Sequence, residues 1–545
     1  MKNINLIINF FYKKYYFFFI LYFILGLLVF KDYGVSTDEE FHRRIGIYWY
    51  NYIFENFFPN IKKYEFFIPY DFTVFQAKDF LFYGIIFDLP SVFLESFLKI
   101  KDAQNYIYLR HFLNFFIFFI SSIFLFKLIT HRFKKKSLAY FAVLFYVFSP
   151  RIFAESFYNY KDILFLSICL ITCCQIYFFF KKKNFFRIFL ISIYIAILFC
   201  IRPVAVILIF LFVIYLIIDL FYEKKKFFKN FYFLFFFGFF FIFFIFLFHP
   251  FFWNNLLDNF INYLFIFKQY SHDVYLFFNG DYLKTTKLPW YYSFVWIILT
   301  YPLIILIAFF FGFFLIFDRI FKRFLNIEKR KYNRFDLWNN HNEKFDLFIY
   351  SILFFSFFLI LKLNATLYDG WRHIYFVHFF IVYFAIYFFY NLISFFKRFR
   401  RILFSILTIY FFILSYTNIS YHPFQNIYFN FLIKNPHEYF DIDYWGLSYK
   451  DALKIILSKD QRNSITVSNA SFTPLSRSIL ILNENERKRL RYSGQEYLIS
   501  DYIITNNYSE VNKKLNKKYS IPSNFNLFYE KWINNVLIYQ IYKKK

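Results

Sequence analysis

The sequence is poor in several residue types, and each shortage narrows what the protein can be. Its 545 residues include 10 Gly, 12 Pro, 4 Cys and 1 Met. The four cysteines lie inside apolar segments with no histidine or acidic residue beside them, so we predict neither a disulfide framework nor a cysteine metal site. No internal repeat is visible, and nothing resembles the inverted repeats of secondary transporters. Rare residues are therefore informative wherever they gather.

Charged residues are also scarce, at 18% of the chain against 60% hydrophobic and 29% aromatic residues. A soluble protein of this size could not cover so much apolar surface. Apolar segments of about 20 residues recur along the chain, which is the length that crosses the hydrocarbon core of a bilayer. The composition therefore predicts a polytopic α-helical membrane protein.

The net charge of +28 does not indicate a nucleic-acid partner, because the positive residues are confined to loops between apolar segments. These loops alternate with loops that are poor in Lys and Arg, as the positive-inside rule describes. We interpret them as topology determinants that also contact anionic membrane lipids. The five basic clusters are 131–136, 181–187, 223–229, 318–334 and 397–401.

Following the basic clusters predicts about eleven spans, with the N-terminus in the cytoplasm of a multi-pass protein of the cell (inner) membrane. The first apolar segment lacks a small-residue cleavage site, so we interpret it as a retained span. Residues 1–420 would form the membrane domain, and 421–545 a small extracytoplasmic α/β domain. The expected spans are 15–30, 106–130, 137–150, 162–180, 185–200, 203–222, 230–249, one from about 288 to the fourth basic cluster, 347–363, 374–393 and 402–418.

Most of the rare residues gather at the external ends of the spans. The first external loop opens with "GVSTDEEFHRR" (34–44), which fits the start of a capped helix. Glu39 and Glu40 each stand four residues before an arginine, a spacing that favours ion pairs along a helix. Asp38 has no such basic partner and lies close to the membrane surface. It is therefore our first candidate for a functional carboxylate.

Two further clusters lie at external span ends. "FYNYKD" places Lys161 and Asp162 at the mouth of one span, where Asp162 could simply complement the helix dipole. "LYDGWRH" places Trp371, Arg372 and His373 where another span enters the membrane. Snorkelling explains one interfacial arginine, but a neighbouring histidine and tryptophan favour an anionic headgroup held there.

With these loops, the chain resembles the GT-C membrane glycosyltransferases. It is most similar to the protein O-mannosyltransferases and aminoarabinose-transferase-like enzymes of glycosyltransferase family 39. The resemblance rests on the acidic first loop, on "SPRIFAESFYNYKD" (149–162), on "DGWRH" and on the C-terminal external domain. It implies a polyprenyl-phosphate sugar donor and a catalytic acid at Asp38 or Glu39. It further implies a second-loop acid at Asp162 and phosphate binding by Lys161, Arg372 and His373.

The chemistry of these residues suits such a reaction. A carboxylate beside the acceptor hydroxyl can take its proton as attack proceeds, and fixed cations, including Arg151, can stabilise the phosphate that leaves. Asp38 and Asp162 would supply oxygen ligands to a divalent metal such as Mg or Mn, although no ligand spacing requires one. The acceptor could be a lipid, a glycan or a protein.

Two alternatives belong to other classes. A transporter or lipid flippase would carry charged or broken helices near the bilayer midplane, whereas these span interiors are nearly free of charge. A structural or assembly protein with an external binding domain would leave the polar loop clusters unexplained. We therefore expect a glycosyltransferase.

Overall fold

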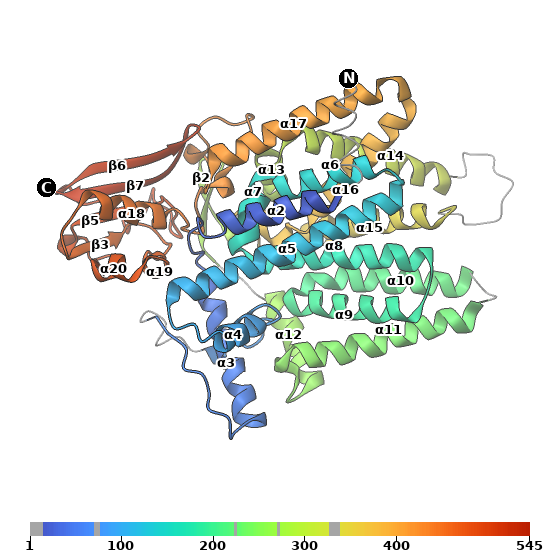
Figure 1. The fold of residues 1–545 in the computed structure, drawn as a ribbon, viewed down its shortest axis with the longest axis horizontal. Helices are drawn as coiled ribbons and strands as arrows, with labels where there is room; N and C mark the ends of the chain where they lie inside the picture. The colour runs from blue at the N-terminus through green and yellow to red at the C-terminus, as the bar shows by residue number, and fades with distance from the viewer. Residues whose placement is uncertain (1–14, 70–76, 223–225, 270–272, 326–337, 364) are drawn as a thin grey trace.

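The protein has a helical bundle with a small sheet domain at one end (Figure 1). The structure is a computed structural model that describes residues 15–69, 77–222, 226–269, 273–325, 338–363 and 365–545. Within them, eight helices are long and apolar enough to cross a membrane, or nine if a pair bent by 65° is one span. This confirms the predicted polytopic membrane fold.

Every predicted span coincides with a helix in the described residues. Two of these helices, α2 and α9, are apolar but shorter than the other spans, and α6 continues after a bend into α7 (Pro150–Tyr158). The helices are α2 (Tyr15–Val29), α5 (Ala103–Phe133), α6 (Lys136–Phe148), α8 (Tyr160–Lys181), α9 (Phe185–Ile201), α10 (Val206–Tyr222), α11 (Phe227–Phe248), α14 (Leu303–Phe324), α15 (His341–Lys362), α16 (Val377–Phe395) and α17 (Arg400–Tyr421).

The helix α8 lies at the centre of the bundle. The most apolar 18-residue stretch of α8 is entirely buried, whereas only 22% of the corresponding stretch of α11 or α17 is buried. A helix that is apolar on all sides suits such a position, and the exposed phenylalanines of the outer helices suit lipid contact. Close packing is visible where α14 meets α16: a Cβ on Gly312 would lie 1.9 Å from the carbonyl oxygen of Phe384.

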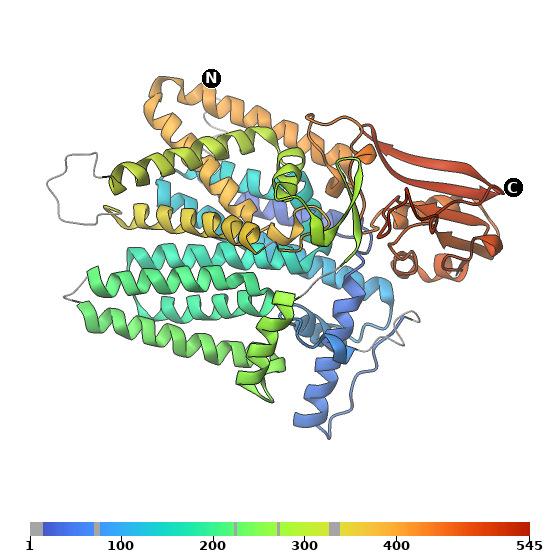
Figure 2. The same cartoon turned by 180° about the vertical axis from the view of Figure 1, so that it is seen from behind.

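The external loops contain elements that the sequence analysis did not predict. α3 (Glu39–Phe57), which was expected, crosses the ends of the spanning helices instead of running along them (Figures 1 and 2). The additional elements are α4 (Asp88–Phe97), α12 (Leu256–Gln269) and an antiparallel hairpin of β1 (Tyr275–Phe278) and β2 (Asp281–Lys284). The span expected from about 288 is divided in the structure, because a short helix, α13 (Tyr292–Thr300), precedes α14.

The C-terminal domain is built on a five-stranded sheet of order β4-β3-β5-β7-β6. β3 pairs in parallel with β4 and β5, and β7 pairs antiparallel with β5 and β6. This combination of helices and a sheet agrees with the small α/β domain expected at the C-terminus. Its elements are α18 (Tyr449–Lys459), β3 (Ile465–Asn469), α19 (Ser476–Leu480), α20 (Glu484–Lys488), β4 (Leu490–Tyr492), β5 (Tyr502–Thr505), β6 (Phe525–Ile533) and β7 (Val536–Lys544).

The helix ends beside the five basic clusters lie at the end of the bundle remote from the C-terminal domain (Figures 1 and 2). At this end Asp346 is fully buried and accepts hydrogen bonds from Arg132, Arg319 and Tyr383. The four residues come from α15, α5, α14 and α16, so one carboxylate ties four helices together.

The separation of the basic clusters from the C-terminal domain generates a topology prediction. A reporter fused after Lys545 should be extracytoplasmic, and one inserted within 319–334 should be cytoplasmic, because positive loops are retained inside. Protease protection or a compartment-sensitive reporter measures both. A cytoplasmic reporter after Lys545 would contradict the proposed orientation.

The Asp346 cluster generates a stability prediction. Asp346→Ala should destabilise the protein by about 3–5 kcal/mol, because it leaves two guanidinium groups without their shared carboxylate. The midpoint of thermal unfolding in detergent measures the effect.

Asp318→Ala is the matched control for that measurement. Asp318 is also paired, with Lys322 one turn away, but its side chain is 56% exposed. Exposed helical pairs contribute little, so this variant should unfold close to wild type. If the two substitutions lowered the unfolding midpoint equally, burial of the Asp346 cluster would make no contribution to stability.

Candidate active site

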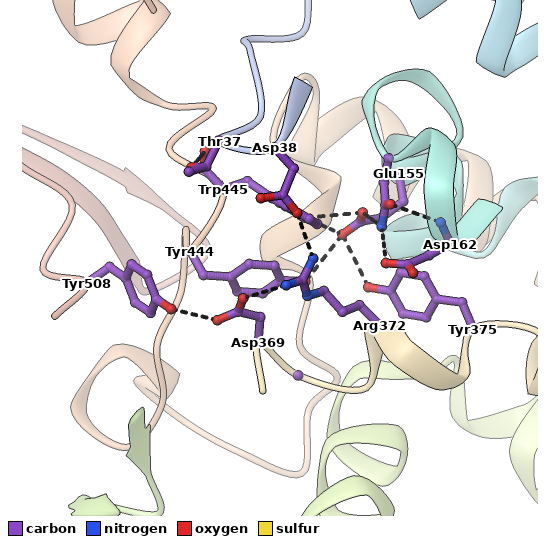
Figure 3. Close-up of polar contacts among 12 residues, drawn as sticks. Thr37, Asp38, Glu155, Asp162, Asp369, Arg372, Tyr375, Tyr444, Trp445 and Tyr508 are labelled. Carbon is purple, nitrogen blue, oxygen red and sulfur yellow. Dashed lines mark hydrogen bonds and ion pairs between the residues drawn. The ribbon is translucent and has the colours of Figure 1, made fainter. Parts of the chain in front are cut away.

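A chain of polar contacts links the first external loop, the loop before α16 and the C-terminal domain (Figure 3). Arg372 donates from Nη1 to Asp38 Oδ2 at 3.2 Å, and its Nη2 lies 3.2 Å from Asp369 Oδ2. Tyr508 of the C-terminal domain donates its hydroxyl to Asp369 Oδ1 at 2.7 Å. Asp38 is thus bonded to a guanidinium that lies 334 residues away in sequence.

A sharp turn places Arg372 at this position. Asp369 and Gly370 both have positive φ angles, of 56° and 74°, which reverse the chain just before the 3₁₀ turn η7 (Arg372–Ile374). Glycine adopts this conformation without strain, and aspartate tolerates it better than most residues. The turn directs Arg372 back toward the first loop, where it reaches Asp38.

Arg372 lies between aromatic rings as well as carboxylates. Its guanidinium carbon is 4.8 Å from the ring centroid of Tyr368 and 4.6 Å from that of Trp445, and the residue is 6% exposed. Burial alone would lower the pKa of Arg372, but Asp369, Tyr368 and Asp38 raise it well above its usual value. Arg372 therefore stays charged, and its buried Nε has no hydrogen-bond partner in the described chain.

Asp38 and its neighbour Glu39 differ in their contacts and in their exposure. Glu39 Oε1 accepts the backbone N–H of Ser36 at 2.7 Å, so Glu39 caps the start of α3, and its carboxylate also contacts His111 Nε2. Asp38 makes no side-chain cap, and its side chain is 43% exposed. Of the two predicted carboxylates, Asp38 is therefore the one that an acceptor can approach.

The ion pairs expected along α3 are partly different in the structure. Arg43, predicted to pair with Glu39, instead bonds to Glu40 one turn before it and to Glu95 of α4. Glu39 turns toward His111, as described above. Arg43 and Glu95 are both buried. A buried guanidinium is stable only when it is well paired, so Arg43 binds a second carboxylate, from another helix, in place of the local i, i+4 partner.

Lys161 and Asp162 lie in the first turn of α8. Asp162 pairs with Arg202 and accepts a hydrogen bond from Asn159 at 2.9 Å. Lys161 Nζ lies 3.9 Å from the ring centroid of Tyr83. Within the described chain no carboxylate is within ion-pair distance of Lys161, which leaves its side chain available to an anionic ligand.

His42 lies close to several basic side chains of this region. The imidazole is 5% exposed on α3, one turn beyond Asp38. Burial lowers the pKa of His42, and the charges of Lys161, Arg110, Arg202 and Arg372 lower it further. Three of these four cations are themselves paired with carboxylates: Arg110 with Asp88, Arg202 with Asp162, and Arg372 with Asp38.

The remaining predicted cations are Arg151 and His373. Arg151 of α7 donates weakly to the carbonyl of Tyr428 at 3.4 Å and faces the rings of Trp296 and Phe429. It is 2% exposed, and its Nε and Nη1 have no partner in the described residues. His373 packs edge-on against Tyr368 at 4.5 Å.

Glu155 is a central residue of the site that sequence reasoning missed. It is fully buried on α7 and accepts hydrogen bonds from the side chains of Tyr375, Tyr444, Trp445 and Asn159 (Figure 3). Glu155 belongs to "SPRIFAESFYNYKD" (149–162), whereas Tyr444 and Trp445 belong to "DIDYWG" (441–446). Nothing in the sequence indicated that the two segments meet.

A divalent metal at Asp38 and Asp162 does not fit this arrangement. Asp38 is bonded to Arg372 and Asp162 to Arg202, so a guanidinium already occupies each carboxylate. In the part of the chain that the structure describes, no group of three His, Cys, Asp or Glu residues is placed to hold a metal ion. We therefore assign no step to a metal.

The comparison with known families decides the class of the protein. Residues 92–249 match the family described as dolichyl-phosphate-mannose-protein mannosyltransferase. This match confirms the resemblance to the GT-C membrane glycosyltransferases. No curated protein is found to match the chain. With the membrane-length helices, the match identifies a membrane glycosyltransferase that uses a lipid-linked sugar donor.

The matched range begins within α4 and ends at the residue after α11. It contains Arg151, Lys161 and Asp162 but neither Asp38 nor Arg372. The contact between Asp38 and Arg372 is therefore an independent structural observation about this chain.

Proposed function

We propose that the protein transfers a sugar, a hexose or pentose, from a polyprenyl phosphate to an acceptor hydroxyl on the extracytoplasmic face of the inner membrane. The observation that carries this proposal is the contact between Asp38 and Arg372 at the end of the bundle that bears the C-terminal domain. It joins an accessible carboxylate to a buried cation at the level where the spanning helices end. Residues 1–420 would form the membrane domain and 421–545 the external domain.

Asp38 would act as the general base. Its half-exposed carboxylate can accept the proton of an acceptor hydroxyl while the hydroxyl oxygen forms a bond to the anomeric carbon of the donor. Glu39 supports this role by capping α3, which fixes the position of Asp38. The contact with Arg372 orients the Asp38 carboxylate before the acceptor arrives.

Arg372 and Lys161 would hold the donor phosphate. As the bond between the sugar and the phosphate breaks, its electron pair passes to the phosphate oxygen, and fixed cations stabilise the developing charge. Arg372 has a buried Nε–H without a partner, and Lys161 has no carboxylate partner among the described residues. Arg151 and His373 would add positive charge and shape farther from the reacting atoms.

Asp38→Asn generates the first activity prediction. Loss of the base should lower the turnover number by about 100-fold or more, on the scale of removing a general base. The assay follows transfer from a polyprenyl-phosphate sugar by the purified protein in lipid nanodiscs.

Asp32→Asn is the matched control for Asp38→Asn. Asp32 lies in the same loop, pairs with His422 and has a similar side-chain exposure of 48%. It should keep wild-type turnover. Full turnover by the Asp38→Asn protein would refute the base assignment.

Arg372→Lys and Arg372→Ala together distinguish three roles of the guanidinium: stabilising the leaving phosphate, binding the donor, and acting as an interfacial anchor. Lysine cannot donate to Asp38 and Asp369 from a planar fork, so it should replace arginine poorly. If Arg372 stabilises the leaving phosphate, Arg372→Ala should lower kcat by about 100-fold, and if it only binds the donor, KM should rise instead. Measurements at saturating and limiting donor distinguish these outcomes.

Arg462→Lys is the control for that series. Arg462 also bridges two aspartates, Asp460 and Asp501, but on the exposed surface of the C-terminal domain. Its replacement should leave kcat and KM unchanged. If Arg372→Lys behaves in the same way, Arg372 is an interfacial anchor and has no phosphate role.

A further inference from the structure

We propose that Trp445 of the C-terminal domain is a positioning residue for the transfer reaction, because it holds Arg372 and the loop of Asp38 in place. This inference rests on the proposed function and goes beyond it, since it makes a part of the external domain necessary for the arrangement of the site. Three contacts of one side chain and its backbone carry it (Figure 3).

The first two contacts involve the indole of Trp445. Its Nε1–H donates to both carboxylate oxygens of Glu155, at 3.1 and 3.2 Å. Its ring lies 4.6 Å from the guanidinium carbon of Arg372. A hydrogen bond at one edge and a cation on one face fix the plane of the indole, because each has a preferred geometry.

The third contact involves the backbone of Trp445. Its carbonyl oxygen accepts a hydrogen bond from Thr37 Oγ1 at 3.1 Å, and Thr37 directly precedes Asp38. Trp445 therefore touches the segments that carry Asp38, Arg372 and Glu155. These three segments belong to the first loop, η7 and α7.

The segment that carries Trp445 is itself held firmly. The carboxylate of Asp443 accepts the backbone N–H groups of Leu447 and Ser448, and its carbonyl accepts the side-chain amide of Asn506 at 2.8 Å. A Cβ on Gly34 would lie 2.2 Å from the Leu447 carbonyl oxygen, so the first loop packs directly against this segment. Trp445 thus approaches the site from a rigid support.

This arrangement explains why a tryptophan suits the position. Arg372 bonds to Asp38 with one Nη and to Asp369 with the other, so a small rotation of its plane would break one of the two contacts. The indole face prevents that rotation. Glu155 would keep the donors Tyr375, Tyr444 and Asn159 without Trp445, so the main loss on its removal would fall on Arg372.

The test compares Trp445→Leu and Trp445→Phe in the full-length protein in nanodiscs, with a polyprenyl-phosphate sugar as the probe. Trp445→Leu should lower kcat by about 10- to 100-fold, since misplacing a group by about 1 Å costs that much. Trp445→Phe should recover a large part of kcat, because it keeps an aromatic face under Arg372.

Trp532→Leu is the matched control. Trp532 is another tryptophan of the C-terminal domain, and its Nε1–H also donates to a glutamate, Glu530, at 3.1 Å. It lies on the exposed strand β6, with 47% of its surface accessible. Its replacement should leave kcat and KM unchanged, so it reports any general effect of removing a tryptophan from this domain.

A double mutant distinguishes positioning from general packing. If Trp445 acts through Arg372, the Trp445→Leu, Arg372→Ala protein should be no slower than Arg372→Ala alone. Independent structural damage would instead multiply the two effects, and that result would overturn the proposal. Wild-type kcat in Trp445→Leu would overturn it as well.

A structure of Trp445→Leu separates this inference from the proposed function. If the wild-type protein consumes no polyprenyl-phosphate sugar, the proposed function fails, but the positioning role can still be tested. We expect Arg372 to lose its contact with Asp38 or Asp369 in Trp445→Leu and to keep both in Trp532→Leu. An unchanged Arg372 in Trp445→Leu would refute the role of Trp445 whatever the substrate.

Discussion

The guanidinium of Arg372 is the group on which the architecture of the site depends. A buried ionised group costs several kcal/mol unless it is paired, so Arg372 requires both Asp38 and Asp369. Meeting that requirement brings the first external loop, the turn before α16 and, through Tyr508, the C-terminal domain to one point. In the proposed function the same charge would also bind the donor phosphate, so that folding of the site and binding of the donor would both depend on Arg372.

The membrane-spanning helices can be predicted from the sequence because each one is determined by the residues of its own segment. An apolar segment must form a helix to satisfy its own backbone in lipid, and basic loops mark one side, so each predicted span corresponds to a helix. The irregular elements between the spans cannot be predicted in this way. The helix α4 and the β1–β2 hairpin lie between spans, where neither hydrocarbon nor a long periodic pattern dictates their structure, and the packing of distant segments decides it.

The site was predictable as a set of residues but not as a set of contacts. Asp38, Lys161, Asp162 and Arg372 stand out because polar residues are rare at span ends, and the structure places all four at the outer end of the bundle. Their partners depend on tertiary packing: Arg43 binds Glu95 where the sequence favours Glu39. Glu155 accepts hydrogen bonds from Asn159, from Tyr375 just before α16 and from the C-terminal domain. A single sequence contains no signal for a contact between residues 155 and 445.

The contacts from Asp38 to Tyr508 also affect how the protein is made. The first loop leaves the ribosome early, but its partners at Trp445 and Tyr508 are synthesised hundreds of residues later and must cross the membrane in the proposed topology. Non-local contacts of this kind form late in folding, after the elements they join have been inserted. A nascent chain would therefore remain inert in the membrane until its external domain has folded, so activity itself reports complete biogenesis.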